Sequence, residues 1–304
     1  MLHQLKPGLL AVAVALAALA APAQAAQQSD GGQGASAAAP VQEHHAGKLV
    51  FVELLTPDLP AAERFYAAMF GWTFKDMQTG SGAYATAWLD GQQVGAMLQR
   101  ALPAGSQRQS AWLSFLATTD VDATRKLVVS QGGKVLLEPR DVPKRGREAV
   151  FADPQGAVFA ALSSTGGDGP DELADVGDWI WTSLQTSDAD SGAAFYQNLF
   201  GYDVYPLPAD PGAMHLLLSS GDYLRASANS LPSTAAGVHP HWLNYVRVTD
   251  AEQSVARAVS LGGRVLVKPQ LDRHGGKVAV VADPLGAPVG LFEWSDTENK
   301  EVAK

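Results

Sequence analysis

The feature that most constrains this chain is an internal repeat with a constant offset, since 188 − 58 and 283 − 153 both equal 130. The recurring pairs are Asp58 and Asp188, Phe65-Tyr66 and Phe195-Tyr196, Phe70-Gly71 and Phe200-Gly201, Trp112 and Trp242, Asp120 and Asp250, Gly132-Gly133 and Gly262-Gly263, and Asp153-Pro154 and Asp283-Pro284. A constant offset over such a span indicates duplication of a whole domain.

A weaker repeat lies inside each half. Asp58 to Asp120 and Gly71 to Gly133 are both 62 positions apart (120 − 58 and 133 − 71). Each half therefore consists of two modules, and each module is expected to contain a strand, a capped helix and three short strands. In the second module these last strands are expected at residues 134–139, 148–152 and 157–162.

The first module shows the local signals on which this expectation depends. Residues 49–55 form a short apolar run broken only by Glu53, which favours a strand. Asp58 is placed to cap the helix that follows, and Pro60 sits early in that helix, where a missing amide costs little. Gly71 is expected to end the helix in a left-handed conformation.

With these motifs in place, the chain resembles the vicinal oxygen chelate superfamily, which includes glyoxalases, bleomycin-resistance proteins and extradiol dioxygenases. The residues that carry the resemblance are Thr56-Pro57-Asp58, Phe65-Tyr66, Phe70-Gly71-Trp72, Asp120-Val121-Asp122-Ala123, Gly132-Gly133 and Asp153-Pro154-Gln155-Gly156, with counterparts in the second half. The resemblance implies an α+β fold of two tandem glyoxalase-like domains, each of two paired βαβββ modules. We expect these domains at residues 48–163 and 178–296, with a linker at 164–177 and a polar tail at 297–304.

The N-terminal segment has the pattern of an export signal. An apolar run at residues 9–21 follows Lys6 and is followed by Ala23-Gln24-Ala25, a small-x-small cleavage pattern. We expect cleavage after Ala25, a disordered spacer over residues 26–47 and a periplasmic or secreted mature protein. The run is short for a membrane span, but an uncleaved anchor is the alternative.

Charge and composition exclude several classes of partner. The formal net charge is -9, which argues against nucleic acid or an anionic membrane surface as the main partner. The 304-residue chain contains no cysteine, so disulfides, thiolate catalysis and thiolate metal ligands are excluded. A small-molecule ligand is the expected partner, and the oligomeric state stays open.

The resemblance also implies a divalent metal held by His, Glu or Gln at fixed strand positions. At the matching positions this chain has Phe51, Leu113, Trp181, Leu243, Ala160 and Gly290, with Met97 and Ser227 near the remaining two. None of these is a good ligand for such an ion. We therefore expect neither a metal nor another cofactor.

Glu53 is the weak candidate for a catalytic residue. It shares the cleft-facing side of its strand with Phe51, where a partly buried carboxylate would have a raised pKa and could act as a general base or substrate anchor. The alternative is a strand carboxylate paired with a nearby Arg or amide. Because Ser183 stands at the equivalent position, we expect the first domain to be the more selective of the two.

Further candidates lie on the strands expected to line the clefts. The expected ligand-cleft residues are Phe51, Glu53, Phe115, Trp181, Gln185, His241 and Tyr245. The aromatic ones form either an open ligand pocket or a packed core. His241 lies at the cleft mouth or in solvent, and a metal pair with His239 or with His215 is the less favoured interpretation.

The charged loops allow two interpretations as well. Lys144-Arg145-Gly146-Arg147 and Asp272-Arg273-His274-Gly275-Gly276 occupy equivalent loops, which are expected to be solvated or to form a basic rim for an anionic ligand. His44-His45 is expected to be solvated, with adventitious metal binding as the alternative.

Three functions are compatible with these observations. The leading hypothesis is an exported, metal-free protein that binds a small molecule, as the bleomycin-resistance branch does. The second is a glyoxalase-like lyase or dioxygenase with a relocated metal site. The third is an interaction module whose clefts are closed.

Overall fold

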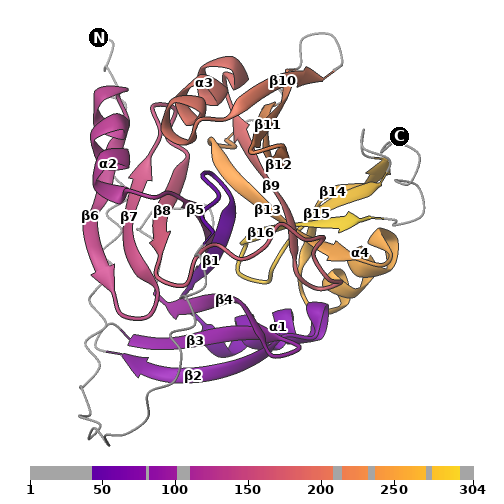
Figure 1. The fold of residues 1–304 in the computed structure, drawn as a ribbon. Helices are drawn as coiled ribbons and strands as arrows, with labels where there is room; N and C mark the ends of the chain where they lie inside the picture. The colour runs from indigo at the N-terminus through magenta and orange to yellow at the C-terminus, as the bar shows by residue number, and fades with distance from the viewer. Residues whose placement is uncertain are drawn as a thin grey trace, which may run out of the picture.

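The computed structural model describes residues 43–79, 82–100, 110–207, 214–231, 237–271 and 276–294. The first half contains β1 (Leu49–Thr56), α1 (Leu59–Phe70), β2 (Thr73–Thr79), β3 (Gly82–Leu89), β4 (Gln92–Gln99), β5 (Ala111–Ala117), α2 (Val121–Ser130), β6 (Lys134–Val142), β7 (Gly146–Ala152) and β8 (Val158–Ser164). The second half contains β9 (Trp179–Thr186), α3 (Ala189–Phe200), β10 (Asp203–Leu207), β11 (His215–Ser220), β12 (Tyr223–Ser230), β13 (His241–Val248), α4 (Ala251–Ser260), β14 (Arg264–Leu271), β15 (Lys277–Ala282) and β16 (Pro288–Glu293). The four βαβββ modules are therefore confirmed (Figure 1).

Each half forms one eight-stranded sheet. The strand orders are β2-β3-β4-β1-β5-β8-β7-β6 and β10-β11-β12-β9-β13-β16-β15-β14, so the two sheets have the same topology. The first strands of the two modules, β1 and β5, pair antiparallel at the centre, and each pairs in parallel with the last strand of its own module. The expected α+β fold of two tandem domains is confirmed.

The helix boundaries follow from local capping. The side chain of Asp58 accepts a hydrogen bond from the amide of Ala61 at 2.9 Å, which satisfies a free donor of the first turn. Gly71 ends α1 with φ at 77° in the left-handed region, which a side chain would strain. Asp188 and Gly201 repeat both features on α3. These expectations are confirmed.

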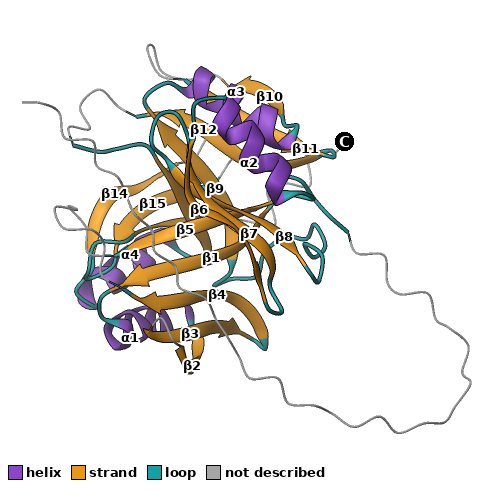
Figure 2. Ribbon diagram, turned by 90° about the vertical axis from the view of Figure 1, so that its left-hand side faces the viewer, coloured by secondary structure: helices purple, strands orange, loops and turns teal. Residues whose placement is uncertain are grey.

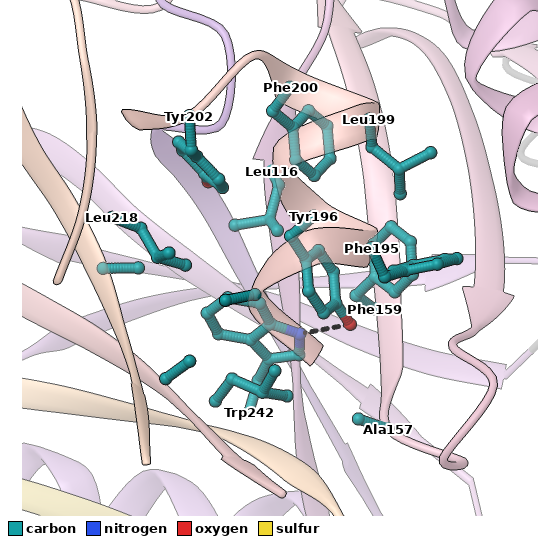
Figure 3. Packing of buried hydrophobic residues seen from close by; sticks show 14 of the residues in the cluster. Leu116, Ala157, Phe159, Phe195, Tyr196, Leu199, Phe200, Tyr202, Leu218 and Trp242 are labelled. Atoms are coloured by element: carbon teal, nitrogen blue, oxygen red, sulfur yellow. Dashed lines mark hydrogen bonds between the residues drawn. The ribbon is translucent and has the colours of Figure 1, made fainter. Parts of the chain in front are cut away.

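The two halves share their hydrophobic cores. One core is built mainly from the second module of the first half and the first module of the second half, with Trp242 added from β13. It includes Leu116, Val128, Phe159, Phe195, Tyr196 and Trp242. Figure 3 shows this cluster, in which the indole of Trp242 donates to the hydroxyl of Tyr196 at 2.9 Å. The other core joins the two remaining modules and includes Leu54, Tyr66, Trp72, Val248, Val281 and Leu291.

The helices pair in the same way across the halves. Helix α1 contacts α4, and α2 contacts α3. Figure 2 shows α2 with α3 at one end of the molecule and α1 with α4 at the other. Between them the central strands meet, where Ser114 on β5 donates to the side-chain oxygen of Asn244 on β13 at 2.9 Å. Each sheet thus has an inner face, which packs against helices and the other half, and an opposite face.

For strands β4 and β12, equivalent residues lie 131 and not 130 positions apart (227 − 96). Glu53 pairs with Ala96 on β4, and Ser183, which is 130 positions later, pairs with Ser227 on β12. Ala96 and not Met97 is therefore the counterpart of Ser227. Met97 lies in an inner-face core. A shift of one residue exchanges the faces of a strand, so the position expected near Met97 is that of its neighbour Ala96.

The described end of the expected spacer is bound to the fold. The hydroxyl of Tyr202 donates to the carbonyl oxygen of Gly47 at 2.6 Å, and the amide of Gly47 donates to Ala117 at 2.9 Å. His44 lies against Asp168 and His45 against Asp171, both in the linker, and the two histidine side chains are only 29% and 20% exposed. The expectation of a free spacer is wrong for residues 43–47.

The signal segment, the rest of the spacer, the loop at residues 272–275 and the tail at 297–304 lie outside the described residues. Among the described helices, none combines the length and the apolar character needed to cross a bilayer.

Candidate functional site

The face of each sheet opposite the inner cores carries the sequence-predicted site residues. We call these two surfaces the first cleft and the second cleft. Because side chains alternate along a strand, inner-facing Leu54 leaves Phe51 and Glu53 on the first cleft, and inner-facing Leu184 leaves Trp181 on the second.

Two aromatic rings form the floor of the first cleft. Phe51 and Phe115 meet edge to face, with their ring centroids 5.3 Å apart. They pack with the buried side chains of Leu113 and Ala160, which occupy family metal-ligand positions. The predicted aromatic pair is thus brought together by the antiparallel register of β1 and β5.

Glu53 lies in this cleft with 2% of its surface exposed. Its Oε2 atom accepts hydrogen bonds from both Nη atoms of Arg145 at 3.3 Å and from the hydroxyl of Tyr84 at 3.5 Å. Its Oε1 atom is buried and has no hydrogen-bond partner within the described residues. This is the paired strand carboxylate of the second interpretation.

Arg145 is the residue whose location the sequence did not predict. It comes from the short β6–β7 loop, yet its guanidinium carbon lies 4.3 Å from the ring centroid of Phe51. It donates to Glu148 at 3.1 Å and to the hydroxyl of Tyr84 at 2.5 Å. The expectation of a solvated basic loop is therefore wrong for Arg145. Arg147 is half-buried, and its guanidinium pairs at the surface with Asp122 and Asp141.

The cluster contains two carboxylates and two guanidinium groups. Glu148 is 1% exposed, and its Oε1 atom accepts from Arg140 at 2.8 Å. Burial raises the pKa of Glu53, and the charge of Arg145 opposes that change. Burial acts to lower the pKa of Arg145, but Glu53, Tyr84 and Glu148 outweigh it and raise the pKa above its usual value. The guanidinium is therefore permanently charged.

The internal ion pair removes the reason for expecting a more selective first domain. That expectation required a ligand to supply the partner of Glu53. Arg145 supplies it from within the chain.

The second cleft carries neutral polar groups at the corresponding positions. The indole of Trp181 donates to the hydroxyl oxygen of Ser227 at 3.2 Å, and the amide of Gln185 donates to Ser183 at 2.8 Å. The ring of Tyr245 lies where a side chain at Gly290 would be, since a β-carbon built there would come within 2.1 Å of it. The ring of Tyr245 thus fills the space next to Gly290, one of the positions at which the resemblance implies a metal ligand.

His241 and His215 lie too far apart to form a metal pair. His241 pairs with Gln185, Gln185 with Asn229, and Asn229 with His215, so the four residues stand in a row across four adjacent strands. At about 4.8 Å between strands, His241 and His215 are about 14 Å apart. The Nδ1 atom of His241 lies 2.8 Å from the carbonyl oxygen of His239.

A cavity of about 490 Å³ opens beside Trp181. Its other aromatic lining residues are Trp179 on β9, Tyr223 on β12, and Phe292 and Trp294 at the end of β16. Linker residues 171–173 form a further part of its wall. Asp171 holds this wall in place, because its carboxylate accepts hydrogen bonds from Arg225 at 2.5 and 2.8 Å.

The divalent metal that the family fold implies does not fit these residues. The ligand positions hold Phe51, Leu113, Leu243, Ala160, Gly290 and the indole of Trp181, which offers no lone pair to a metal, and the guanidinium of Arg145 stands over Phe51. One carboxylate group elsewhere in the described chain, formed by Asp250, Glu252 and Glu293, has ligand atoms within 4.8 Å of one another. Its carboxylates already cap α4 or pair with Lys277.

Both halves of the chain match models of known protein families. The model of the glyoxalase/bleomycin resistance protein/dioxygenase superfamily matches residues 48–160, and that of a glyoxalase-like domain matches residues 181–292. "Putative glyoxylase CFP32" of Mycobacterium tuberculosis is 32% identical over 247 residues, which cover 81% of this chain and 94% of the relative. The chain belongs to this superfamily. "Anthracycline biosynthesis protein DauV" of a Streptomyces species is 34% identical over 262 residues, which cover 81% and 93%.

Solved structures of the superfamily share the fold. The Mn(II)-bound glyoxalase from Novosphingobium aromaticivorans superposes with a TM-score of 0.58 at 18% identity, covering 83% of this chain and 84% of that one. The 2,2',3-trihydroxybiphenyl 1,2-dioxygenase from Sphingomonas wittichii gives 0.56 at 15% identity, covering 81% and 90%. At these identities the likeness concerns the fold alone.

Two groups of functional residues were missed by sequence reasoning. In the first cleft these are Arg145, Tyr84 and Glu148. The available signal was Glu148 itself, a carboxylate that directly precedes the apolar residues 149–152 of β7. In the second cleft they are Arg225 and Asp171, and no local pattern marks the pair because it joins a strand to the linker.

Proposed function

We propose that this superfamily member is an exported protein that binds a small, neutral, aromatic molecule in the second cleft without the family's divalent metal. The observation that carries the proposal is the cavity of about 490 Å³ beside Trp181. Ligand pockets in proteins have volumes of about 300–1,000 Å³ and are mostly apolar with a few polar groups. The N-terminal pattern at residues 9–25 supports export.

The lining favours an aromatic ligand. Trp181, Tyr223, Phe292 and Trp294 all border the cavity, and rings of this kind stack on planar ligands in offset or edge-to-face geometry. The name of one relative, the Streptomyces protein, connects that protein with the biosynthesis of anthracyclines, which are fused-ring aromatic compounds. This supports the same ligand class for the second cleft.

The charges around the cavity favour a neutral ligand. Arg225 is 8% exposed and pairs with Asp171, and Lys48 lies 3.0 Å from the same carboxylate. Arg225, Lys48 and Asp171 thus have partners within the protein, so a charged ligand would be desolvated without gaining an unpaired partner among these three groups.

Titration with 1,4-dihydroxyanthraquinone, a neutral fused-ring probe, tests the proposal through tryptophan fluorescence. The probe should bind at one site, and Trp181→Leu should weaken binding by about tenfold, as expected for a central aromatic contact. Trp88→Leu is the matched control, because Trp88 lies on β3 and its indole donates to Thr86 at 2.8 Å, away from the cavity. Equal effects of the two substitutions, or no binding to the unchanged protein, would contradict the proposal.

A further inference from the structure

The guanidinium of Arg145 is held in the way that a binding site holds a cationic ligand. Its carbon lies 4.3 Å from the ring centroid of Phe51 and 5.6 Å from that of Phe115, which places a cation beside two aromatic rings. Its nitrogens donate to Glu53 and to Glu148. Charge-assisted bonds of this kind select a planar, forked cation.

The groups around this guanidinium are built into the cleft. Glu53 and Glu148 are 2% and 1% exposed, and Tyr84 is 5% exposed. Two buried carboxylates are costly unless a cation accompanies them. The Oε1 atom of Glu53 has no hydrogen-bond partner in the described part of the chain, so the site retains an unused acceptor beside Arg145.

The fold does not require this cluster. At the equivalent positions of the second half the residues are Ser183, His215, Gln270, Gly275 and Val278 in place of Glu53, Tyr84, Arg140, Arg145 and Glu148. The second half forms the same eight-stranded sheet without these carboxylates and guanidinium groups. The first half thus has all five residues of the cluster, and the second half has none of them. This is the pattern expected of a recognition site, because residues that the fold needed would occur in both halves.

Arg145 enters the site from its rim. It belongs to the loop between Val142 and Gly146, and its side chain remains 15% exposed. Because Arg145 lies outside the paired residues of β6 and β7, withdrawing its guanidinium from the site requires no break in the pairing of these strands. We propose that the first cleft is a guanidinium-binding site whose resident occupant is Arg145, so that a ligand with an alkylguanidinium group binds by displacing this side chain. The proposal is independent of the ligand in the second cleft.

Isothermal titration with methylguanidinium tests the proposal. Arg145→Ala should bind this cation at one site. The unchanged protein should bind it at least about tenfold more weakly, because its own side chain competes for the site. Methylurea has nearly the same shape without the charge and should not bind. Arg147→Ala is the matched control, because Arg147 makes its ion pairs on the surface and its removal leaves Arg145 in place.

The double variant Glu53→Gln, Arg145→Ala should lose the affinity for methylguanidinium. If Arg145→Ala does not fold in buffer, refolding should succeed with methylguanidinium and fail with methylurea. Binding or rescue that does not distinguish the two compounds would overturn the proposal. Equal affinity in Arg145→Ala and the unchanged protein would also overturn it.

Discussion

Tyr66 in the first half donates a buried hydrogen bond of 3.3 Å to the carboxylate of Asp283 in the second half. Tyr196 and Asp153, at the equivalent positions, make the reciprocal bond at 3.2 Å. Burial raises the pKa of both carboxyl groups, although backbone amides oppose the change. The two halves are therefore joined by the same buried contact twice, once in each shared core.

Removing either hydroxyl should destabilise the protein by a similar amount. Tyr66→Phe and Tyr196→Phe should each lower the free energy of unfolding by about 1 kcal/mol, because a buried carboxylate loses a donor. Urea denaturation measures the change. Tyr205→Phe serves as the control, because Tyr205 is 51% exposed. If only one of the two substitutions lowers the free energy of unfolding, the two buried contacts are not equivalent.

The halves should not fold independently. Each hydrophobic core takes residues from both halves, so a fragment of residues 48–163 would expose two half-cores. The full chain should unfold in one transition that tryptophan fluorescence and circular dichroism report at the same urea concentration. The isolated fragment should show no cooperative transition as a monomer. Cooperative unfolding of a monomeric half would refute this expectation.

Asp171 should make the protein sensitive to acid. Burial acts to raise its pKa, but hydrogen bonds from Arg225 and Lys48 outweigh burial and lower the pKa from 3.8 to about 2. Because the folded pKa is the lower one, the stabilisation is complete above pH 3.8 and is lost as the pH falls towards 2.

Asp171→Asn tests this dependence. After allowance for solvent screening, it should cost about 1–2 kcal/mol at pH 7 and flatten the stability profile between pH 4 and about 2. Urea midpoints at a series of pH values give the measurement. The substitution Asp203→Asn, at an exposed position on β10, should leave the profile unchanged. If Asp171→Asn loses stability below pH 4 in the same way as the unchanged protein, groups other than Asp171 cause the acid sensitivity.

The mature protein should contain no stoichiometric divalent metal. The family ligand positions hold Phe51, Trp181 and other residues without suitable donors, and Arg145 places a cation in the first cleft. Elemental analysis of protein purified without an affinity tag provides the measurement. One equivalent of Zn, Fe, Mn or Ni that survives dialysis would support the metal-dependent lyase or dioxygenase instead.

We expect the mature protein to begin near Ala26. The apolar run at residues 9–21 followed by Ala23-Gln24-Ala25 has the pattern that signal peptidase cleaves. N-terminal sequencing of protein from the periplasm or medium gives the result directly. An intact Met1 in the membrane fraction would mean that the segment acts as an anchor.

The sequence by itself determined the features that arise within a few residues. Asp58 satisfies an amide three residues away, and Gly71 relieves a backbone conformation at its own position, so both helix ends were readable. Strand alternation placed Phe51 and Glu53 on one face. The repeat then established that these local elements occur four times and assemble into two sheets of one topology.

Only the tertiary structure decided what occupies each cleft. Arg145 reaches Glu53 across 92 positions of sequence, and its long side chain has no local preference between solvent and cleft. The cavity beside Trp181 depends on Asp171 in the linker meeting Arg225 on a strand. Tyr66 and Asp283 are 217 positions apart. Local propensities act over one helical turn or one strand, whereas these charges and donors find partners only after the sheets have packed.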